Sequence, residues 1–490
     1  MAGTRPTRRG LAGLALGAAA IGGAGAVAGL LGGFRWRGDP AALGPAFPAG
    51  FRWGVATSAY QVEGAVGEDG RGPSIWDTFT QAPGRIRDGS TGDVACDHYH
   101  RFPEDIALMK ELGVGAYRFS IAWPRLFPEG RGSANPKGIA FYDRLIDRLL
   151  ANGIEPIPTL YHWDLPQALQ DRGGWASRDT AQAFADYAGY AVGKLGDRVG
   201  RWFTLNEILT FIEEGYGRGR FAPGLSLPRN ELAQARHHAV LAHGLGVQAM
   251  RAAARRKLAV GPAENIHTVL PAVETEADIR AAERATREMN AGYLTVMMEG
   301  RYTDQWLRYM GKDAPRFTDA DLTIISTPVD FVGLNVYTPG AFVRATDAEP
   351  GYVEVPFPPS YPRMDVPWLL FGPEALYWAP RHVSRLWKVP EIYITENGTA
   401  AADTPAADGR IYDLDRIMYL RQYLAQLRRA IGEGVPVRGY YAWSLMDNFE
   451  WYDGYQVRFG LYHVDFATQK RTPKLSADFY RQLVSRNALV

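Results

Sequence analysis

Apolar residues from position 51 onward follow two alternating patterns. Short, almost continuously apolar runs alternate with longer segments in which apolar residues recur at i, i+3 and i+4. The first pattern predicts strands buried on both faces, and the second predicts amphipathic helices. The expected strands are 51–60, 115–123, 154–162, 201–206, 257–265, 330–337, 391–396 and 437–444, and the main expected helices are 103–112, 141–151, 179–195, 233–254, 277–298 and 415–431.

Strand and helix alternation of this kind predicts an α/β fold, namely a (β/α)₈ (TIM) barrel. A chain of 490 residues could hold two or three domains, but such barrels grow past about 250 residues by insertion in their loops. Two stretches without clear periodicity, 64–92 and 349–371, are expected to be long loops at the C-terminal face. Because no linker or further repeat interrupts the pattern, one barrel domain is the simplest interpretation.

Several expected strands end in polar or aromatic residues. The carboxyl ends of barrel strands meet on one face, which is where such folds carry their chemistry. A lone His or Asn at a strand end is more often structural, but six such ends in one chain indicate a shared site. These ends are Tyr60-Gln61, Tyr161-His162-Trp163, Asn206-Glu207, Asn335, Glu396-Asn397 and Asp447-Asn448.

Two of these strand ends carry a glutamate. Glu207 closes the run 201–207, and Glu396 closes the run 392–396. Hydrolysis of a glycosidic bond with retention needs two carboxylates about 5–5.5 Å apart, one as acid/base and one as nucleophile. The pair therefore gives the hypothesis of a glycoside-cleaving site.

Composition narrows the partners and cofactors. The chain has 54 Lys and Arg against 53 Asp and Glu, so we expect no nucleic-acid partner, and the run 255–257 is typical of a solvated face. The single cysteine, Cys96, excludes an intrachain disulfide and is expected to be a buried apolar residue. Two histidines lie within 97–100, but no second ligand cluster follows, so no metal is expected. The Gly-rich stretch 215–224 lacks a strand-Gly-helix fingerprint, so no nucleotide cofactor is expected either.

The first 33 residues differ from the rest of the chain. Arg8-Arg9 precedes an uncharged run rich in Ala, Gly and Leu that reaches Gly33. This pattern is typical of a twin-arginine export signal, with Ala26-Val27-Ala28 as a cleavage site. We expect export to the periplasm or the medium, with transient contact between residues 1–33 and the membrane or export machinery. The run is also long enough to span a bilayer, so an uncleaved membrane anchor is the alternative, and a cytosolic protein is a third possibility.

Six motifs follow one another along the chain. They are FRWGVATSAYQVEG at 51–64, RFSIAWPR at 118–125, YHWDLP at 161–166, TLNE at 204–207, ITENG at 394–398 and WSLMDNFEW at 443–451. In sequence and in order they resemble the motifs of glycoside hydrolase family 1, the β-glucosidase family. The resemblance covers about residues 46–485 and implies a (β/α)₈ barrel, a retaining mechanism, a small-molecule β-glucoside or oligosaccharide substrate and no cofactor.

The resemblance also implies a role for each matching residue. Glu207 would be the acid/base and Glu396 the nucleophile, with Arg118 and Tyr337 hydrogen-bonded to Glu396. An arginine beside a carboxylate favours its ionised form, whereas the acid/base must start protonated. Residues that would hold the sugar are Gln61, His162, Asn206, Trp443, Glu450 and Trp451, and those that would contact the aglycone are Trp163 and Trp368.

Two positions depart from the family pattern. Ile208 follows Glu207 where the family usually has proline, which predicts a different path for the chain after this strand. The segment that begins at Trp368 is one residue longer than the common pattern.

The substrate class follows from the expected place of Glu450 near the 4- and 6-hydroxyls of the sugar. A carboxylate there would repel a phosphate, so an unphosphorylated β-glucoside is expected, with β-galactosides and β-fucosides tolerated. Three alternatives remain: a transglycosylase, a membrane-tethered scaffold, and a non-catalytic sugar-binding relative. A relative of the last kind typically lacks one of the two carboxylates. Turnover of a chromogenic glucoside separates the scaffold from an enzyme, and the oligomeric state stays open.

Overall fold

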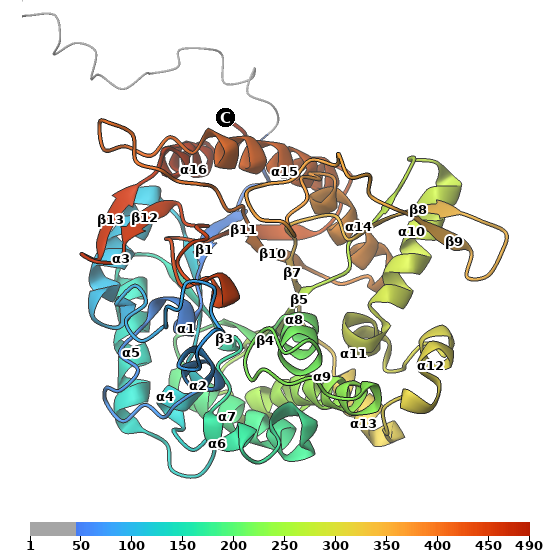
Figure 1. Ribbon diagram of the computed structural model, residues 1–490, viewed down its shortest axis with the longest axis horizontal. Helices are drawn as coiled ribbons and strands as arrows, with labels where there is room; N and C mark the ends of the chain where they lie inside the picture. Colours follow the sequence, from blue (N-terminus) through green and yellow to red (C-terminus); the bar gives the residue numbers. More distant parts are fainter. Residues whose placement is uncertain (1–45) are drawn as a thin grey trace, which may run out of the picture. The chain divides into compact units, whose positions relative to one another are not determined.

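The computed structural model describes residues 46–490, in which eight parallel strands close into a barrel. The strands form an inner ring and the helices surround it (Figure 1). The order around the ring is β1-β11-β10-β7-β5-β4-β3-β2, which confirms the predicted (β/α)₈ barrel. The barrel strands are β1 Arg52–Ala56, β2 Ala116–Ser120, β3 Glu155–Tyr161, β4 Arg201–Asn206, β5 Ala259–Asn265, β7 Val332–Asn335, β10 Ile392–Asn397 and β11 Val437–Trp443.

Burial on both faces explains why the strands are continuous apolar runs. Every residue of β2, β7 and β10 is buried, because one face packs inside the barrel and the other lies under helices. The two ends of the described chain meet at Asn487, whose backbone oxygen accepts from Phe47 N at 2.8 Å and whose side chain accepts from Trp53 Nε1 at 2.9 Å.

Longer helices surround the barrel, and shorter helices lie within the connections between its strands. The longer ones are α3 His98–Leu112, α5 Pro136–Ala151, α7 Arg178–Leu195, α9 Arg229–Ala253, α10 Glu276–Met289, α14 Ala375–Trp387, α15 Leu414–Gly432 and α16 Leu475–Arg486. The shorter ones are α1 Ala59–Val62, α2 Ile75–Thr80, α4 Trp123–Leu126, α6 Gln167–Gln170, α8 Ile208–Ile212, α11 Val296–Glu299, α12 Asp304–Met310 and α13 Asp319–Ile325. Single turns of 3₁₀ or π helix are η2 Gly174–Ala176, η3 Glu213–Gly217, η4 Ala291–Thr295, η5 Gly311–Asp313 and η6 Trp451–Asp453.

The first strand is shorter than predicted. β1 ends at Ala56, and Tyr60 and Gln61 lie in the short helix α1, so the prediction that they end a strand is wrong. The chain leaves the sheet because Ser120 Oγ accepts the backbone N–H of Ala59 at 2.6 Å. That side-chain contact with β2 carries no signal in the local sequence.

Two predicted helices have different limits. α3 begins at His98 rather than at residue 103, because the Asp97 carbonyl accepts from the backbone N–H groups of residues 100 and 101. The helix predicted over 277–298 is broken after Met289. At the break, Asn290 has φ and ψ angles of −103° and 14°, outside the helical range, and its Nδ2 donates to the backbone oxygen of Thr286 at 2.7 Å.

Both predicted long loops contain regular structure. Residues 64–92 include α2, which a capping box between Ser74 and Asp77 begins. Residues 349–371 include β9 Tyr352–Val355, which pairs with β8 Ala341–Ala345 in a small sheet completed by β6 Val269–Pro271. A separate hairpin consists of β12 Tyr462–Asp465 and β13 Lys470–Pro473.

The predicted export signal, residues 1–33, lies outside the described residues. Within residues 46–490, no helix is long and apolar enough to cross a membrane.

Candidate active site

A cavity of about 1130 Å³ lies at the carboxyl ends of the barrel strands. Both glutamates singled out from the sequence line it, although 189 positions separate them in the chain. Of the other predicted site residues, Trp163, Tyr337, Trp368, Trp443, Glu450 and Trp451 also line the cavity. The remaining four, Gln61, Arg118, His162 and Asn206, contact these wall residues from behind or beside them.

Glu396 is the penultimate residue of β10 and is held by two donors. Arg118 Nη1, from β2, lies 2.5 Å from its Oε1, and the Tyr337 hydroxyl donates to its Oε2 at 2.8 Å. Burial raises the pKa of Glu396, whereas the Arg118 charge and these hydrogen bonds act in the opposite direction. The arrangement supplies the arginine and tyrosine contacts that the sequence predicted for a nucleophile.

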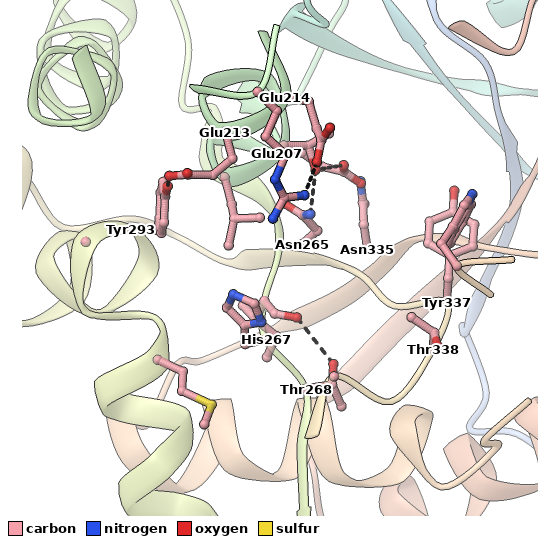
Figure 2. Close-up of a pocket in the computed structure, with 18 of the residues that line it drawn as sticks. Glu207, Glu213, Glu214, Asn265, His267, Thr268, Tyr293, Asn335, Tyr337 and Thr338 are labelled. Atoms are coloured by element: carbon pink, nitrogen blue, oxygen red, sulfur yellow. Dashed lines mark hydrogen bonds and ion pairs between the residues drawn. The ribbon is translucent and has the colours of Figure 1, made fainter. Parts of the chain in front are cut away.

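Glu207 follows β4 directly and is held differently. Asn335 Nδ2 donates to its Oε1 at 2.7 Å and Thr210 Oγ1 to its Oε2 at 2.8 Å, and neither donor is charged. Burial and the neighbouring Glu396 charge raise the pKa of Glu207 to about 7. Figure 2 shows Glu207, Asn265 and Asn335 together in the cavity wall. A carboxyl with this pKa carries a proton for much of the time at neutral pH.

Asn335 connects the two carboxyl groups. Its Oδ1 accepts from the Thr395 hydroxyl at 2.6 Å, so its Nδ2 is directed at Glu207 and at Asn206 Oδ1, 3.1 Å away. Thr395 immediately precedes Glu396 in β10. The amide thus ties the acid candidate to the strand that carries the nucleophile candidate.

Sequence reasoning missed the residues that orient Glu207. Thr210 lies one helical turn after it, and Asn265 Nδ2 donates to Thr210 Oγ1 at 2.6 Å. The i, i+3 spacing of Glu207 and Thr210 and the polar end of the predicted strand 257–265 were the available signals. For Asn335, the sequence predicts a polar strand end but no role.

Three predicted sugar-binding residues, Gln61, His162 and Asn206, are buried and hydrogen-bond to other residues of the protein. Gln61 Nε2 donates to Asn448 Oδ1 at 3.0 Å and to the Phe449 backbone oxygen at 2.9 Å. Asn206 Nδ2 donates to His162 Nε2 at 3.2 Å, and burial together with the Arg118 charge keeps the pKa of His162 well below its usual value. The histidine is therefore neutral. Contact between these residues and a sugar stays a prediction.

Aromatic rings form one side of the cavity. The rings of Trp163 and Trp451 lie 4.5 Å apart, and the His162 ring stacks against Trp443 at 5.7 Å. Trp163 and Trp451 have positive φ angles of 81° and 48°, and Glu207 has one of 52°. Such backbone strain in non-glycine residues clusters at functional sites.

Trp368 lies at the open rim of the cavity. Its side chain is 46% exposed, and its ring lies 5.8 Å from Tyr337 and 6.2 Å from Phe459. This position suits contact with the outer part of a ligand, and the predicted aglycone role stays a prediction.

Gly398 allows the end of β10 to approach β11. A Cβ at this position would lie 1.9 Å from the Trp443 backbone oxygen, so a larger residue would force apart the strand ends that carry Glu396 and Trp443.

The two histidines within 97–100 contact carboxylates of the protein. His98 Nδ1 pairs with Asp105 Oδ2 at 2.7 Å, and His100 contacts Asp97 and Glu68. Within residues 46–490, no group of three or more His, Cys, Asp and Glu side chains could hold a metal ion. Cys96 is buried, and burial raises the pKa of its thiol.

Comparison with known proteins places this geometry in a family. Residues 44–489 match the model of Glycosyl hydrolase family 1. β-Glucosidase A of Acetivibrio thermocellus is 44% identical over 444 residues, which cover 90% of this chain and 98% of the relative. A bifunctional β-D-glucosidase/β-D-fucosidase of Bifidobacterium breve is 43% identical over 461 residues, or 90% of this chain and 98% of the relative. The β-glucosidase of Thermotoga maritima in complex with glucoimidazole has 43% identity and a TM-score of 0.83, and the match covers 91% of this chain and 100% of that structure.

Proposed function

The chain belongs to glycosyl hydrolase family 1, and on this basis we propose that it is a retaining β-glucosidase. It hydrolyses terminal non-reducing β-D-glucosyl residues of unphosphorylated β-glucosides. The observation that carries the proposal is that Glu207 and Glu396 line one cavity in opposite environments. Burial and the Glu396 charge raise the pKa of Glu207 to about 7, whereas Arg118 and Tyr337 hold Glu396 and favour its ionised form.

In the first step, Glu207 protonates the glycosidic oxygen while a carboxylate oxygen of Glu396 attacks the anomeric carbon. The bond to the leaving group breaks as the bond to Glu396 forms, which gives a covalent glycosyl-enzyme. The Arg118 guanidinium and the Tyr337 hydroxyl keep Glu396 oriented and favour its ionised form.

In the second step, Glu207 removes a proton from water, which attacks the anomeric carbon and releases Glu396. The same side chain can serve as acid and then as base because its pKa changes between the steps. The Glu396 charge is one cause of the raised pKa of Glu207. Once Glu396 is esterified, that charge is gone and the pKa of Glu207 falls.

The sugar is held by Gln61, His162, Asn206, Trp443, Glu450 and Trp451. Asn206 is placed beside the acid for the 2-hydroxyl, a contact that strengthens in the transition state. Burial, together with the charges of Asp453, Glu396 and Glu207, raises the pKa of Glu450 well above its usual value. Acidic surroundings that disfavour the charge of Glu450 also disfavour a phosphate dianion, which supports an unphosphorylated sugar.

Hydrolysis rates of the p-nitrophenyl β-glycosides of glucose, galactose, fucose and 6-phosphoglucose test this proposal. We expect fast turnover of the glucoside, slower turnover of the galactoside and fucoside, and none of the 6-phosphoglucoside. The dual activity named for the Bifidobacterium breve relative supports including the fucoside. Loss of glucoside turnover in Glu396→Gly supports the nucleophile, whereas unchanged turnover, or a preference for the phosphorylated sugar, contradicts the proposal.

We also propose that residues 1–33 direct twin-arginine export and that the enzyme acts outside the cytoplasm, on glucosides such as those that cellulose degradation releases. The pair Arg8-Arg9, the uncharged run that follows it and the start of the family match at residue 44 support this. Cell fractionation of the full chain and of an Arg8→Lys/Arg9→Lys variant tests it. Export of the parent and cytoplasmic retention of the variant are expected. Equal export of both forms would contradict the signal, and recovery of the full-length chain in membranes would favour the anchor.

A further inference from the structure

Glu264 is a carboxyl group inside the barrel wall for which the mechanism above has no role. It is the penultimate residue of β5 and only 1% exposed. Its Oε2 accepts the backbone N–H of Ile208 at 3.1 Å. Its Oε1 has no hydrogen-bond partner among the residues that the structure describes. A buried carboxyl with a single partner is costly, so its retention calls for a physical reason.

Glu264 lies behind the site and does not form its wall. The next residue, Asn265, lines the cavity, whereas Glu264 is not among the described residues that do so. Adjacent residues of a strand point to opposite faces, which explains the difference. Burial and the nearby Glu207 raise the pKa of Glu264 well above its usual value, which favours its uncharged form. In that form it acts as a hydrogen-bonding group that adds no charge beside the acid.

The partner of Glu264 is the peptide group that follows the acid/base residue. Glu207 adopts a left-handed backbone conformation with a φ of 52°, which costs free energy in a residue other than glycine. Its own N–H donates to the Ala263 backbone oxygen at 2.8 Å. The following N–H, of Ile208, donates to Glu264. Two consecutive residues of β5 thus hold the peptide groups on both sides of the strained residue.

We propose that Glu264 is a positioning residue for Glu207: by accepting the Ile208 N–H, it keeps the acid carboxyl directed at the glycosidic oxygen. This inference rests on the proposed function, because it presumes that Glu207 is the acid. Without the acceptor, the buried N–H of Ile208 would be unpaired, and the local backbone would relax towards another conformation.

The identity of residue 208 makes the proposal specific to this chain. A proline at the first position of a helix has no N–H and needs no acceptor there. Ile208 begins α8, so it brings a buried N–H that a proline would lack. Glu264 and Ile208 therefore act as a pair, and a proline at 208 should remove the need for the carboxyl.

Aryl β-glucosides whose leaving groups differ in acidity test the pair. Departure of 2,4-dinitrophenolate needs little protonation, whereas departure of unsubstituted phenolate depends on Glu207. For Glu264→Leu we expect kcat/KM for the phenyl glucoside to fall about tenfold or more, the size expected when a buried N–H loses its acceptor. We expect kcat/KM for the dinitrophenyl glucoside to change less than about threefold. Glu264→Gln keeps an acceptor oxygen and should resemble the parent with both substrates.

The rescue variant Glu264→Leu/Ile208→Pro provides the decisive comparison. We expect it to recover most of the turnover of the phenyl glucoside. Equal losses with both substrates, no loss in Glu264→Leu, or no recovery in the double variant would overturn the proposal. If Glu264→Leu fails to fold, the double variant carries the test alone: folding with near-parental leaving-group dependence supports the pair, and failure to fold overturns it. An inactive parent with the dinitrophenyl glucoside would instead contradict the proposed function.

Discussion

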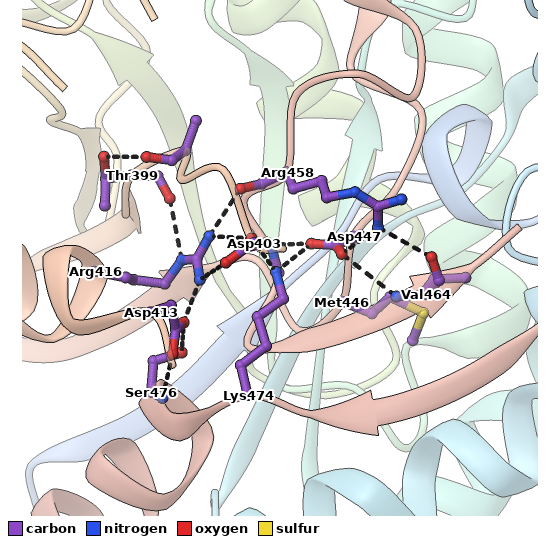
Figure 3. Close-up of polar contacts among 12 residues, drawn as sticks. Thr399, Asp403, Asp413, Arg416, Met446, Asp447, Arg458, Val464, Lys474 and Ser476 are labelled. Carbon is purple, nitrogen blue, oxygen red and sulfur yellow. Dashed lines mark hydrogen bonds and ion pairs between the residues drawn. The ribbon is translucent and has the colours of Figure 1, made fainter. Parts of the chain in front are cut away.

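Replacing Lys474 with methionine should lower the thermal stability of the barrel by breaking a buried ion network. Lys474 Nζ lies 2.5 Å from Asp403 Oδ2 and 2.5 Å from Asp447 Oδ1, and all three side chains are 0% exposed. Arg416 pairs with Asp403 and Asp413, and Arg458 Nη1 lies 2.7 Å from Asp447 Oδ2. Figure 3 shows how these side chains meet from separate segments of the chain. Three cations balance three carboxylates, so removal of one cation leaves an uncompensated buried charge.

The expected magnitude follows from this imbalance. Removing one partner of a buried ion pair costs about 3–5 kcal/mol, and methionine retains much of the apolar stem of lysine. The entropy of unfolding is about 2.1 cal/mol/K per residue, so for a chain of this size about 1 kcal/mol shifts Tm by about 1 °C. We therefore expect Tm to fall by about 3–5 °C at pH 7.

Acid pH should reduce the difference between the parent and Lys474→Met. Although burial opposes ionisation, Lys474 and Arg458 hold the pKa of Asp447 below its usual value. A carboxyl with a lowered pKa in the folded state contributes stability above its unfolded pKa of about 4, and this contribution is lost as pH falls further. In Lys474→Met, the carboxylates take up protons more readily. The difference in Tm between the parent and this variant should therefore shrink between pH 7 and pH 4.

Scanning calorimetry at both pH values measures these effects, with Arg481→Met as the matched control. Arg481 lies in α16, the helix that Lys474 directly precedes. It is 43% exposed and pairs only with Asp478 of the same helix among the ion pairs of the described residues. Such a surface pair is worth about 0–1 kcal/mol. Equal Tm values for the parent and Lys474→Met, or a deficit that grows at acid pH, would refute the reasoning.

Two further predictions concern activity. Because the pKa of Glu207 is about 7, kcat/KM of the parent should fall as pH rises through that value. In Glu207→Gln, kcat/KM for a substrate with a poor leaving group should be about 10²–10⁴-fold lower and should no longer show this alkaline decline. If the pH–rate profile of the variant kept the decline, another group would be responsible for it. Trp368→Ala should raise KM for aryl glucosides several-fold and leave kcat nearly unchanged, because an aglycone contact is alike in the ground and transition states. The control is Tyr412→Ala, which removes an aromatic ring that is 47% exposed and lies outside the cavity wall. A change in kcat alone for Trp368→Ala would exclude a binding role for Trp368.

The sequence predicted the barrel and its central carboxylates because both leave local signals. Continuous apolar runs mark strands buried on both faces, and a polar residue directly after such a run marks the carboxyl end of a strand. Glu207 and Glu396 stand at such ends, and closure of the barrel brings them to one cavity. Hydrogen bonds to Glu396 from Arg118 and Tyr337 match the contacts that the family resemblance implied.

Other features depend on contacts between distant segments and could not be read locally. The turn after β1 needs Ser120, and Glu264 meets Ile208 only after β4 and β5 are side by side. At the break after Met289, Asn290 Oδ1 accepts the backbone N–H of His267 at 2.9 Å, a contact across 23 positions of sequence. Lys474 contacts Asp403 and Asp447, which lie 71 and 27 positions away in the sequence, and no local pattern indicates these contacts.

The most direct test of the central claim is the identity of the residue that forms the covalent glycosyl-enzyme. The enzyme is incubated with 2-deoxy-2-fluoro-β-D-glucosyl fluoride, whose good leaving group allows the first step while the fluorine slows the second. Mass spectrometry of the digested protein then locates the sugar. The account predicts one fluoroglucosyl group per chain, on Glu396; a label on Glu207 or on any other residue, or turnover without a trapped adduct, would contradict it.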